Sequence, residues 1–321
     1  MKIFSRIITS YWGIYGVLAL LWIVGSILSP PFRTVDNVSN VIVKATTLAM
    51  VALGQTFVLL TANFDLSVGG IVGLSTAIGS CTMEQNLAMG VVLVLVVGTA
   101  IGFVNGVGVA KFGVNSVIMT LGTLSIAQGI GLYLRPYPGG MVPLSYIDFF
   151  AISVYGIPVV ALGLILVVTT ICILFLERRS FGRHIYIVGG SEDSAIRAGI
   201  SVSRIKIAVF SISGFLAACG GLFMTSIIGS GDSLVGESYM FQSFTAALLG
   251  GTAITGGEGN VKGTLGAVFI IASLGSLFNL VGINTWYQNI FLGALLIAVL
   301  TSKLIYDRIR VERVQYGADM A

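Results

Sequence analysis

Charged residues are scarce in this sequence. Only 9% of its 321 residues are charged, whereas 56% are hydrophobic. Soluble domains carry about 25% charged residues, so this chain has too little charge to cover a water-exposed surface. It also has no basic tract with interleaved aromatic residues, and we expect no nucleic-acid partner. The solvent for most of the chain is therefore lipid, and we predict an integral membrane protein.

Cysteine and histidine are also few. Cys81, Cys172 and Cys219 lie in or beside apolar runs and form no CxxC pair, which is typical of small buried residues. His184 is the single histidine, and one histidine without partners cannot build a metal site. The sequence has no cluster of His, Asp and Glu and no Ser–His arrangement. We therefore expect neither an enzyme nor a metal site.

Long apolar runs, by contrast, are abundant. A membrane-spanning helix needs about 20 predominantly apolar residues. Loops of at most a few tens of residues separate these runs, so we predict one all-α transmembrane domain over 1–321 with about ten helices. Two of the segments, 66–82 and 240–255, are short and rich in glycine. The expected segments are 11–29, 41–61, 66–82, 87–110, 114–134, 157–176, 205–228, 240–255, 263–282 and 286–302.

The positions of Lys and Arg predict the orientation. Basic residues gather before the first segment, between the fourth and fifth, in the loop at about 177–204, and after the tenth. Ten spans place all four groups on the same side of the membrane. The positive-inside rule makes that side cytoplasmic. We therefore predict that both termini are cytoplasmic.

Glycines recur at helical spacing inside the apolar segments. Gly98, Gly102 and Gly106 form one row, and Gly69 and Gly73 form another. Small residues four positions apart let helix backbones approach closely, which favours helix association in lipid. The pattern indicates close packing and carries no information about a substrate.

Two polar, glycine-rich stretches, 61–70 and 250–263, interrupt the apolar segments. Broken helices expose backbone groups that must face a cavity or protein, and paired breaks mark the translocation path of many transporters. Asp65 precedes a helix expected from Leu66, so it is equally typical of an N-cap in a tight cytoplasmic turn. The second stretch lacks the GK[ST] ending of a P-loop, so we expect no ATP hydrolysis by this chain. The expected path residues are Asn63, Asp65, Ser67, Thr252 and Thr255.

The loop at 177–204 contains a predicted helix of about two turns, which is too short to be stable alone in water. Ser191 suits the N-cap, Glu192 and Asp193 the first turn, Arg197 the last turn, and Gly199 the position after the helix. Such a helix needs a surface on which to dock. We interpret it as a docking site for a cytoplasmic partner, with a solvated interfacial turn as the alternative.

Three motifs carry a resemblance to a known family. They are FDLSVGG at 64–70, FGRHIYIVGGSEDSAIRAGISVSRIKI at 181–207 and LGGTAITGGEGNVKGTLGA at 249–267. The chain resembles the permease subunits of bacterial ABC importers for ribose and related simple sugars, a group that includes the autoinducer-2 permeases. The motifs occur in the family's order, and the match covers nearly the whole chain.

The resemblance implies a multi-pass permease of the bacterial inner membrane that forms the path for a simple sugar. Such a permease pairs with a second copy or a sister permease and receives sugar from an extracytoplasmic binding protein. Its partner ATP-binding-cassette subunits bind the ATP and Mg, so this chain is expected to hold no cofactor. The short helix would be the coupling helix that docks on the ATPase. The docking residues implied are Gly189, Gly190, Ser191, Glu192, Asp193, Ser194, Ala195, Arg197 and Gly199.

Two departures from the family pattern leave the choice of sugar open. Residues 62–64 read Ala-Asn-Phe where the family usually has two glycines. Where relatives tend toward an acidic ELDAIAA segment, residues 239–247 lack the acidic residue and gain aromatic ones. The alternative function is a stand-alone secondary transporter or channel for a small polar solute. That alternative would need Asp65 as an ion-coupling carboxylate at membrane depth.

Overall fold

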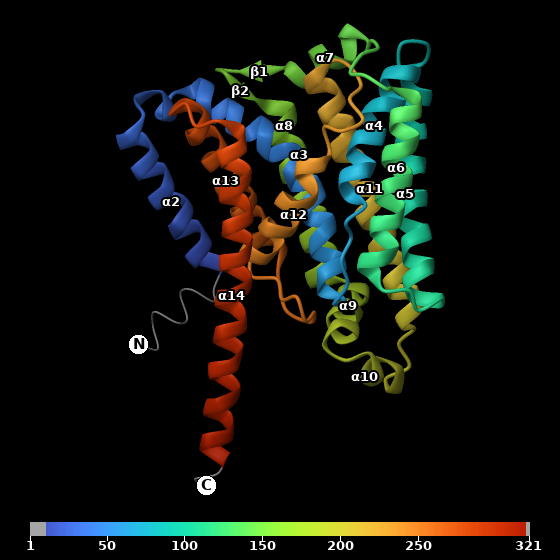
Figure 1. The fold of residues 1–321 in the computed structure, drawn as a ribbon, viewed down its shortest axis with the longest axis vertical. Helices are drawn as coiled ribbons and strands as arrows, with labels where there is room; N and C mark the ends of the chain where they lie inside the picture. The colour runs from blue at the N-terminus through green and yellow to red at the C-terminus, as the bar shows by residue number, and fades with distance from the viewer. Residues whose placement is uncertain (1–10, 319–321) are drawn as a thin grey trace.

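A computed structural model describes the backbone of residues 11–318 and the side chains of residues 12–301. Helices occupy all ten of the expected apolar segments, which confirms the all-α class (Figure 1). They are α2 (Tyr11–Leu28), α3 (Val35–Leu60), α4 (Val68–Thr82), α5 (Leu87–Lys111), α6 (Ser116–Leu134), α8 (Val159–Arg178), α11 (Val202–Ile228), α12 (Glu237–Leu249), α13 (Val261–Leu280) and α14 (Thr285–Ala318).

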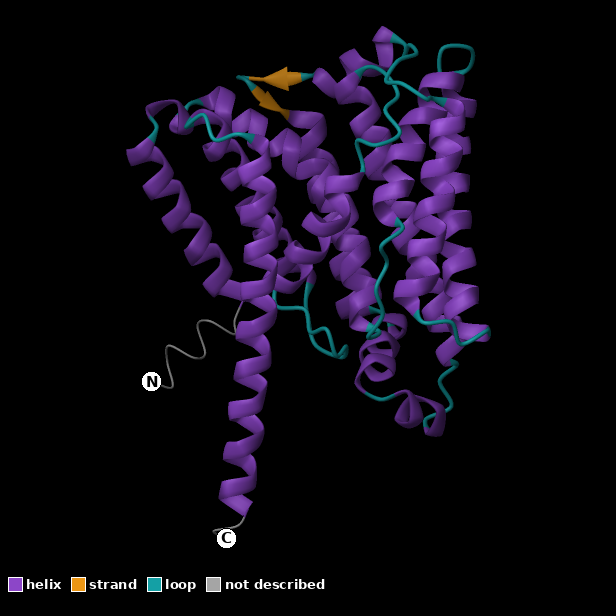
Figure 2. Cartoon of the chain, in the orientation of Figure 1, coloured by secondary structure: helices purple, strands orange, loops and turns teal. Residues whose placement is uncertain are grey.

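Six of these helices are long and apolar enough to cross a membrane: α3, α5, α6, α8, α11 and α13. Shorter elements connect them at the two ends of the bundle (Figure 2). These are the 3-10 helix η1 (Pro30–Arg33), α7 (Leu144–Ala151), the antiparallel pair β1 (Ser153–Val154) and β2 (Ile157–Pro158), α9 (Ser180–Gly190) and α10 (Glu192–Arg197).

Side-chain caps fix where several of the long helices begin. The Asn86 side chain accepts a hydrogen bond from the Met89 amide at the start of α5, and the Asn260 side chain accepts one from the Gly263 amide at the start of α13. Each cap satisfies an amide that has no partner inside the helix, and this matters because lipid supplies none. The starts of α5 and α13 agree with the expected segments to within two residues, whereas α3 begins six residues earlier than expected and α14 continues to Ala318, well beyond the expected end at 302.

Helix α12 differs from its expected segment. It begins at Glu237 and ends at Leu249, whereas the apolar run suggested 240–255. Gly250 follows it as the cap residue, and Gly251 has a φ of 93°, a left-handed conformation that ends the helix. Residues 250–260 are therefore a loop at one end of the bundle.

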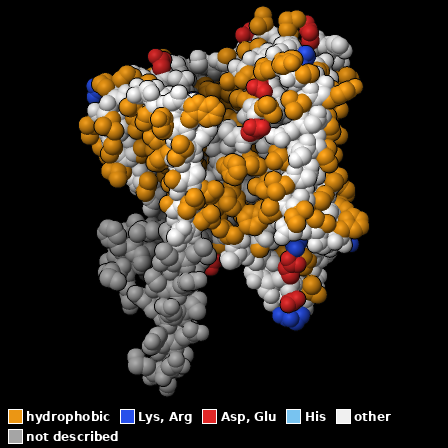
Figure 3. All heavy atoms as spheres, viewed as in Figure 1, with side chains coloured by type: hydrophobic (Ala, Val, Ile, Leu, Met, Phe, Trp, Pro, Cys, Tyr) orange, Lys and Arg blue, Asp and Glu red, His pale blue; other side chains and the backbone are white. Residues whose placement is uncertain are grey.

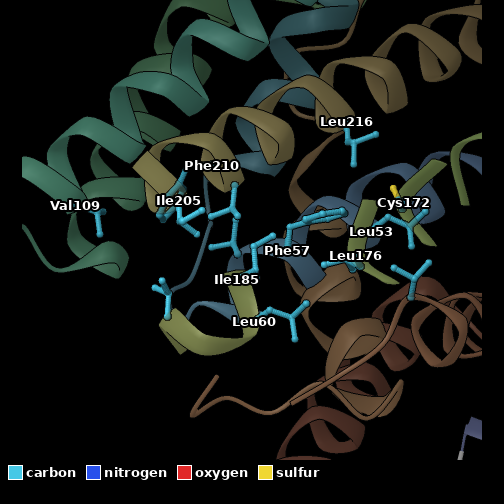
Figure 4. Packing of buried hydrophobic residues seen from close by; sticks show 14 of the residues in the cluster. Leu53, Phe57, Leu60, Val109, Cys172, Leu176, Ile185, Ile205, Phe210 and Leu216 are labelled. Atoms are coloured by element: carbon cyan, nitrogen blue, oxygen red, sulfur yellow. The ribbon is translucent and has the colours of Figure 1, made fainter. Parts of the chain in front are cut away.

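Helix α11 packs against α3, α4 and α5 and forms the centre of the molecule. One hydrophobic cluster joins α3, α8 and α11 to the short helix α9, so α9 is part of the bundle rather than a free loop (Figure 4). Cys172 is buried in this cluster as a small apolar residue. The members labelled in Figure 4 are Leu53, Phe57, Leu60, Val109, Cys172, Leu176, Ile185, Ile205, Phe210 and Leu216.

The two most basic regions lie at the same end of the bundle. Helices α9 and α10 lie at the lower end in Figure 1, and α14 extends past that end. Four of the ten segments, α11 to α14, follow the loop at 177–204, and an even number of passes returns the chain to the end at which it started.

Candidate functional site

The first break, residues 61–67, folds back from the end of α3 toward the middle of the bundle (Figure 2). Ala62 turns the chain with a φ of 57°, and its amide donates to the Leu59 carbonyl. The Phe64 amide donates to Ser116 Oγ at 3.1 Å, so α6 supplies a partner to the extended backbone. This is the compensation that a broken helix needs at membrane depth.

Asp65 lies inside a buried chain of hydrogen bonds. Its Oδ1 accepts from the Ser67 amide at 3.1 Å and from Ser67 Oγ at 2.5 Å. Ser67 Oγ in turn accepts from Asn105 Nδ2 at 2.9 Å, and Asn105 Oδ1 accepts from Thr123 Oγ1 at 2.7 Å. This chain joins the first break to α5 and α6. Asp65 is 1% exposed, so the carboxyl braces the break and does not face a cavity.

Helix α4 begins at Val68, two residues later than the sequence suggested, with Ser67 at its N-cap position. Asp65 therefore holds a single amide just before the helix. Asp65 Oδ2 and the Ser213 hydroxyl of α11 are both buried without a hydrogen-bond partner among the described residues. Of the expected path residues in this break, Asn63 lines a cavity and Asp65 and Ser67 do not.

The second break, residues 250–260, is a compact loop outside the core. Thr252 is fully buried within it, next to Gly259, whereas Thr255 is exposed on its surface. The Ala253 amide donates to the Glu258 carbonyl at 2.7 Å and closes the loop. Neither threonine lines either of the two cavities described for this chain.

Both breaks meet α9 at one place, which we call the junction and define as Leu60, Ala62, Gly189, Gly256 and Gly257. The Gly257 amide donates to the Leu60 carbonyl at 3.0 Å. A Cβ on Gly189 would lie 1.8 Å from the Leu60 carbonyl oxygen, and one on Gly256 would lie 2.7 Å from the Ala62 amide nitrogen. The three backbones therefore touch directly, and side chains are excluded between them.

Side chains strengthen the contacts that α8 and α9 make with the second break and with the start of α13. The Tyr186 hydroxyl of α9 donates to the Gly259 carbonyl at 2.9 Å. Lys262 Nζ, at the start of α13, lies 2.8 Å from Glu177 Oε1, at the end of α8. Burial raises the pKa of Tyr186, and the nearby Glu177 carboxylate raises it further, so the phenol keeps the proton that it donates.

Helix α10 occupies the centre of the predicted docking segment. Ser191 Oγ accepts from the Ser194 amide, Arg197 donates to Ser194 Oγ, and Gly199 ends the turn with a φ of 75°. Ala195 is the buried residue of α10 and packs in the hydrophobic cluster, whereas Ile196 is 62% exposed among charged residues. Gly189 and Gly190, which the sequence placed in the same loop, are instead the last two residues of α9.

An open cavity of about 500 Å³ separates α10 from the α5–α6 loop. The ion pair between Lys206 Nζ and Glu192 Oε1, at 2.5 Å, lies in its wall. Lys206 is 11% exposed, so this pair fixes α10 to the start of α11. The remaining lining includes Ala62, Asn63, Phe64, Asn115, Ser116, Ile196 and Ser203.

The two glycine rows lie at helix contacts. A Cβ on Gly102 would lie 2.2 Å from the Phe210 carbonyl oxygen of α11, and Gly98 and Gly106 are similarly close to that helix. Gly69 and Gly73 contact a different region, the irregular segment 229–236 between α11 and α12. A Cβ on Gly73 would lie 2.1 Å from the Ser233 carbonyl oxygen.

The segment 229–236 is a third break that the sequence analysis did not identify. The signal was present, because Gly229, Gly231 and Gly236 punctuate it. It leads into Glu237, the first residue of α12, whose carboxylate accepts a hydrogen bond from Gln128 Nε2 of α6 at 3.2 Å. Both residues were absent from the expected path.

Comparisons with known proteins give one consistent result. The model of a family described as "Branched-chain amino acid transport system / permease component" matches residues 37–300. The chain is 36% identical to the ribose import permease of Haemophilus influenzae, over 90% of this chain and 91% of that protein. It is 33% identical to the D-allose transport system permease of Escherichia coli, over 90% of each chain. It is 31% identical to the L-arabinose transport system permease of the same species, over 95% of this chain and 92% of the relative.

Proposed function

This chain belongs to the family of sugar ABC importer permeases, and from this membership we propose that it forms the translocation path of an importer for a simple sugar. The relatives with named substrates are permeases for ribose, allose and arabinose. All three are neutral monosaccharides. The substrate proposed here is therefore a neutral monosaccharide of that kind.

The proposed mechanism rests on the direct backbone contacts at the junction. Helix α10 protrudes at the basic end of the bundle, and the preceding helix, α9, touches the last residue of α3 and the second break through Gly189. A displacement of α10 therefore reaches the end of α3 and the loop before α13 without passing through flexible side chains. We propose that a cassette ATPase binds α10 and that this backbone contact transmits its motion to the path.

The partners proposed follow from the same mechanism. ATP and Mg are bound by the ATPase subunits, and an extracytoplasmic binding protein delivers the sugar at the opposite end. A second permease, identical or related, completes the path. The basic end of the bundle then faces the cytoplasm, in accordance with the positive-inside rule.

The experiment that tests this function is sugar uptake by proteoliposomes containing the chain with its ATPase and binding protein. We expect uptake of radiolabelled D-ribose, D-allose or L-arabinose only with ATP inside. Replacing Glu192, Asp193 and Ser194 by alanine should abolish sugar-stimulated ATP hydrolysis while the assembly still expresses. Alanine at the exposed Asp148 of α7, at the other end of the bundle, is the control. Intact coupling in the triple variant would overturn the docking assignment.

A stand-alone transporter is the alternative function. It requires a carboxylate that exchanges ions with water, and Asp65 is buried and engaged with Ser67. Sugar flux driven by a sodium or proton gradient, in liposomes that contain this chain alone, would favour the alternative.

A further inference from the structure

Glu237 is exposed on a face of the bundle that is otherwise largely hydrophobic. Figure 3 shows acidic side-chain atoms on this face, over the segment before α12 and the start of α12. Among the described residues, the Glu237 carboxylate accepts one side-chain hydrogen bond, from Gln128. The two ion pairs among the described residues join Glu192 to Lys206 and Glu177 to Lys262, so neither of them neutralises Glu237.

The Glu237–Gln128 pair lies well inside the membrane. Gln128 follows Ser116, the first residue of α6, by twelve positions and precedes Leu134, the last, by six. At about 1.5 Å per residue, Gln128 is about 18 Å from one end of the helix and about 9 Å from the other. Gly236, next to Glu237, packs on Gly69 near the start of α4, and this contact places the pair beside the short helix α4 as well.

An exposed carboxylate at this depth does not face lipid. Charged side chains within membrane spans cost several kcal/mol in hydrocarbon, and they face a protein interior or a water-filled path instead. One turn before Gln128 on the same face of α6, Ser125 is exposed and polar, whereas Leu132, one turn after Gln128, is exposed and apolar. The strip of this face that holds Ser125, Gln128 and Glu237 is therefore its hydrated part.

Aromatic side chains continue this face along α12. Phe241 and Phe244 follow Glu237 at helical spacing, and Phe241 is 57% exposed. The ring of Phe244 lies 5.5 Å from the ring of Phe64, between ring centres, and Phe64 belongs to the first break. The polar pair Glu237–Gln128 therefore lies beside aromatic rings, and the ring of Phe244 contacts the first break.

We infer that Glu237 and Gln128, with Phe241 and Phe244 beside them, form a sugar-contact site in the translocation path; this inference rests on the proposed function. A carboxylate accepts hydrogen bonds from two sugar hydroxyls, and the Gln128 amide both donates and accepts. The aromatic rings cover the apolar C–H face of the sugar. The Glu237 charge repels anions, so the site selects neutral, hydroxyl-rich solutes over phosphorylated sugars.

Uptake by the complete transporter in proteoliposomes tests the site. The probes are D-ribose, D-allose and L-arabinose, each radiolabelled. We expect Glu237→Gln and Gln128→Leu each to slow ATP-dependent uptake about tenfold, because a hydrogen bond to a charged group or its partner is lost. Glu84→Gln, at an exposed acid in the turn between α4 and α5, is the matched control and should leave uptake unchanged.

Thiol labelling tests the hydrated face without transport. In the complete transporter in nanodiscs, with Cys81, Cys172 and Cys219 replaced by serine, Ser125→Cys should react with a charged, membrane-impermeant thiol reagent. Its sequence neighbour Ile126 is 62% exposed but points to a different side of α6, so Ile126→Cys should stay unreactive in lipid. Equal reactivity at the two positions would overturn the inference.

The two experiments separate failure of the site from failure of the proposed function. Wild-type sugar uptake that Glu237→Gln and Gln128→Leu both leave intact overturns the site alone. A wild-type transporter that takes up none of the three sugars overturns the proposed function and the sugar assignment together. In that case the labelling of Ser125→Cys still decides whether the face contacts water.

Discussion

At the scale of single residues, glycine is the residue type on which this fold depends most visibly. The rows on α4 and α5 lie where another backbone occupies the space of a side chain. Because lipid tails are as apolar as the side chains, close backbone packing replaces the hydrophobic effect as the force that holds helices together. A glycine at such a contact stabilises the bundle by its small size alone.

Gly102→Leu should therefore destabilise the protein strongly. The new side chain would overlap the Phe210 carbonyl of α11, since even a Cβ would lie 2.2 Å from its oxygen. Overpacking of this kind costs about 1–3 kcal/mol, and more when backbone must move. Thermal unfolding in detergent measures the effect. Gly122→Leu on α6, where a Cβ meets nothing within 4 Å, is the control and should unfold near the wild-type temperature.

Tyr186 gives a pH prediction at the same scale. Its pKa is raised above the ordinary 10.0, so the folded protein keeps the phenol proton that the unfolded chain loses. This contribution to stability is fully present below about pH 10 and declines as the pH rises further. The stability difference between the protein and Tyr186→Phe should be constant from pH 6 to 9, at about 1 kcal/mol. Urea unfolding at several pH values measures it, and a difference that changes across that range contradicts the assignment.

At the scale of elements, the short helices α9 and α10 have different sources of stability. Helix α9 buries Ile185 and Val188 against the core, whereas α10 buries only Ala195 among its own residues. A six-residue helix with so little burial depends on its caps and on the Glu192–Lys206 ion pair.

Ser191→Ala should weaken coupling by loosening the start of α10. Loss of this N-cap costs about 1 kcal/mol, which is large for so short a helix. Sugar-stimulated ATP hydrolysis by the reconstituted transporter should fall, and Ser191→Asp should restore it because aspartate also accepts from the Ser194 amide. If both variants couple as well as the wild type, the structure of α10 is not important for docking.

At the scale of the whole molecule, orientation is the property that the charge pattern predicts. In a chain without native cysteines, Asp193→Cys in α10 should react with an impermeant thiol reagent only from the cytoplasmic side. Asp148→Cys, in α7 at the opposite end, should react only from outside. Both side chains are exposed, so accessibility does not distinguish them. The reverse pattern in right-side-out vesicles would refute the proposed topology.

Much of this architecture follows from the sequence because lipid imposes a simple requirement. Each crossing needs an apolar run, and the basic loops determine parity, so ten segments, the all-α class and their common basic end are readable from the chain. The helix at Glu192–Arg197 is also readable, because Ser191 and Gly199 are typical cap residues. Each of these features depends on residues that are close together in the sequence, so the sequence alone predicts them.

Other features required the tertiary structure. Helix α9 forms because Ile185 and Val188 pack against a core built by α3, α8 and α11. The residues of that core are far apart in the sequence, so the local sequence around α9 does not predict it. The burial of Asp65 depends on Asn105 and Thr123, which distant segments supply. The proposed role of Glu237 depends on its depth in the bundle and on its contact with Gln128 of α6, and only the tertiary packing of the helices determines both. Hydrophobic runs are a property of the chain, whereas the partner of a polar group in lipid is decided by which helices pack together.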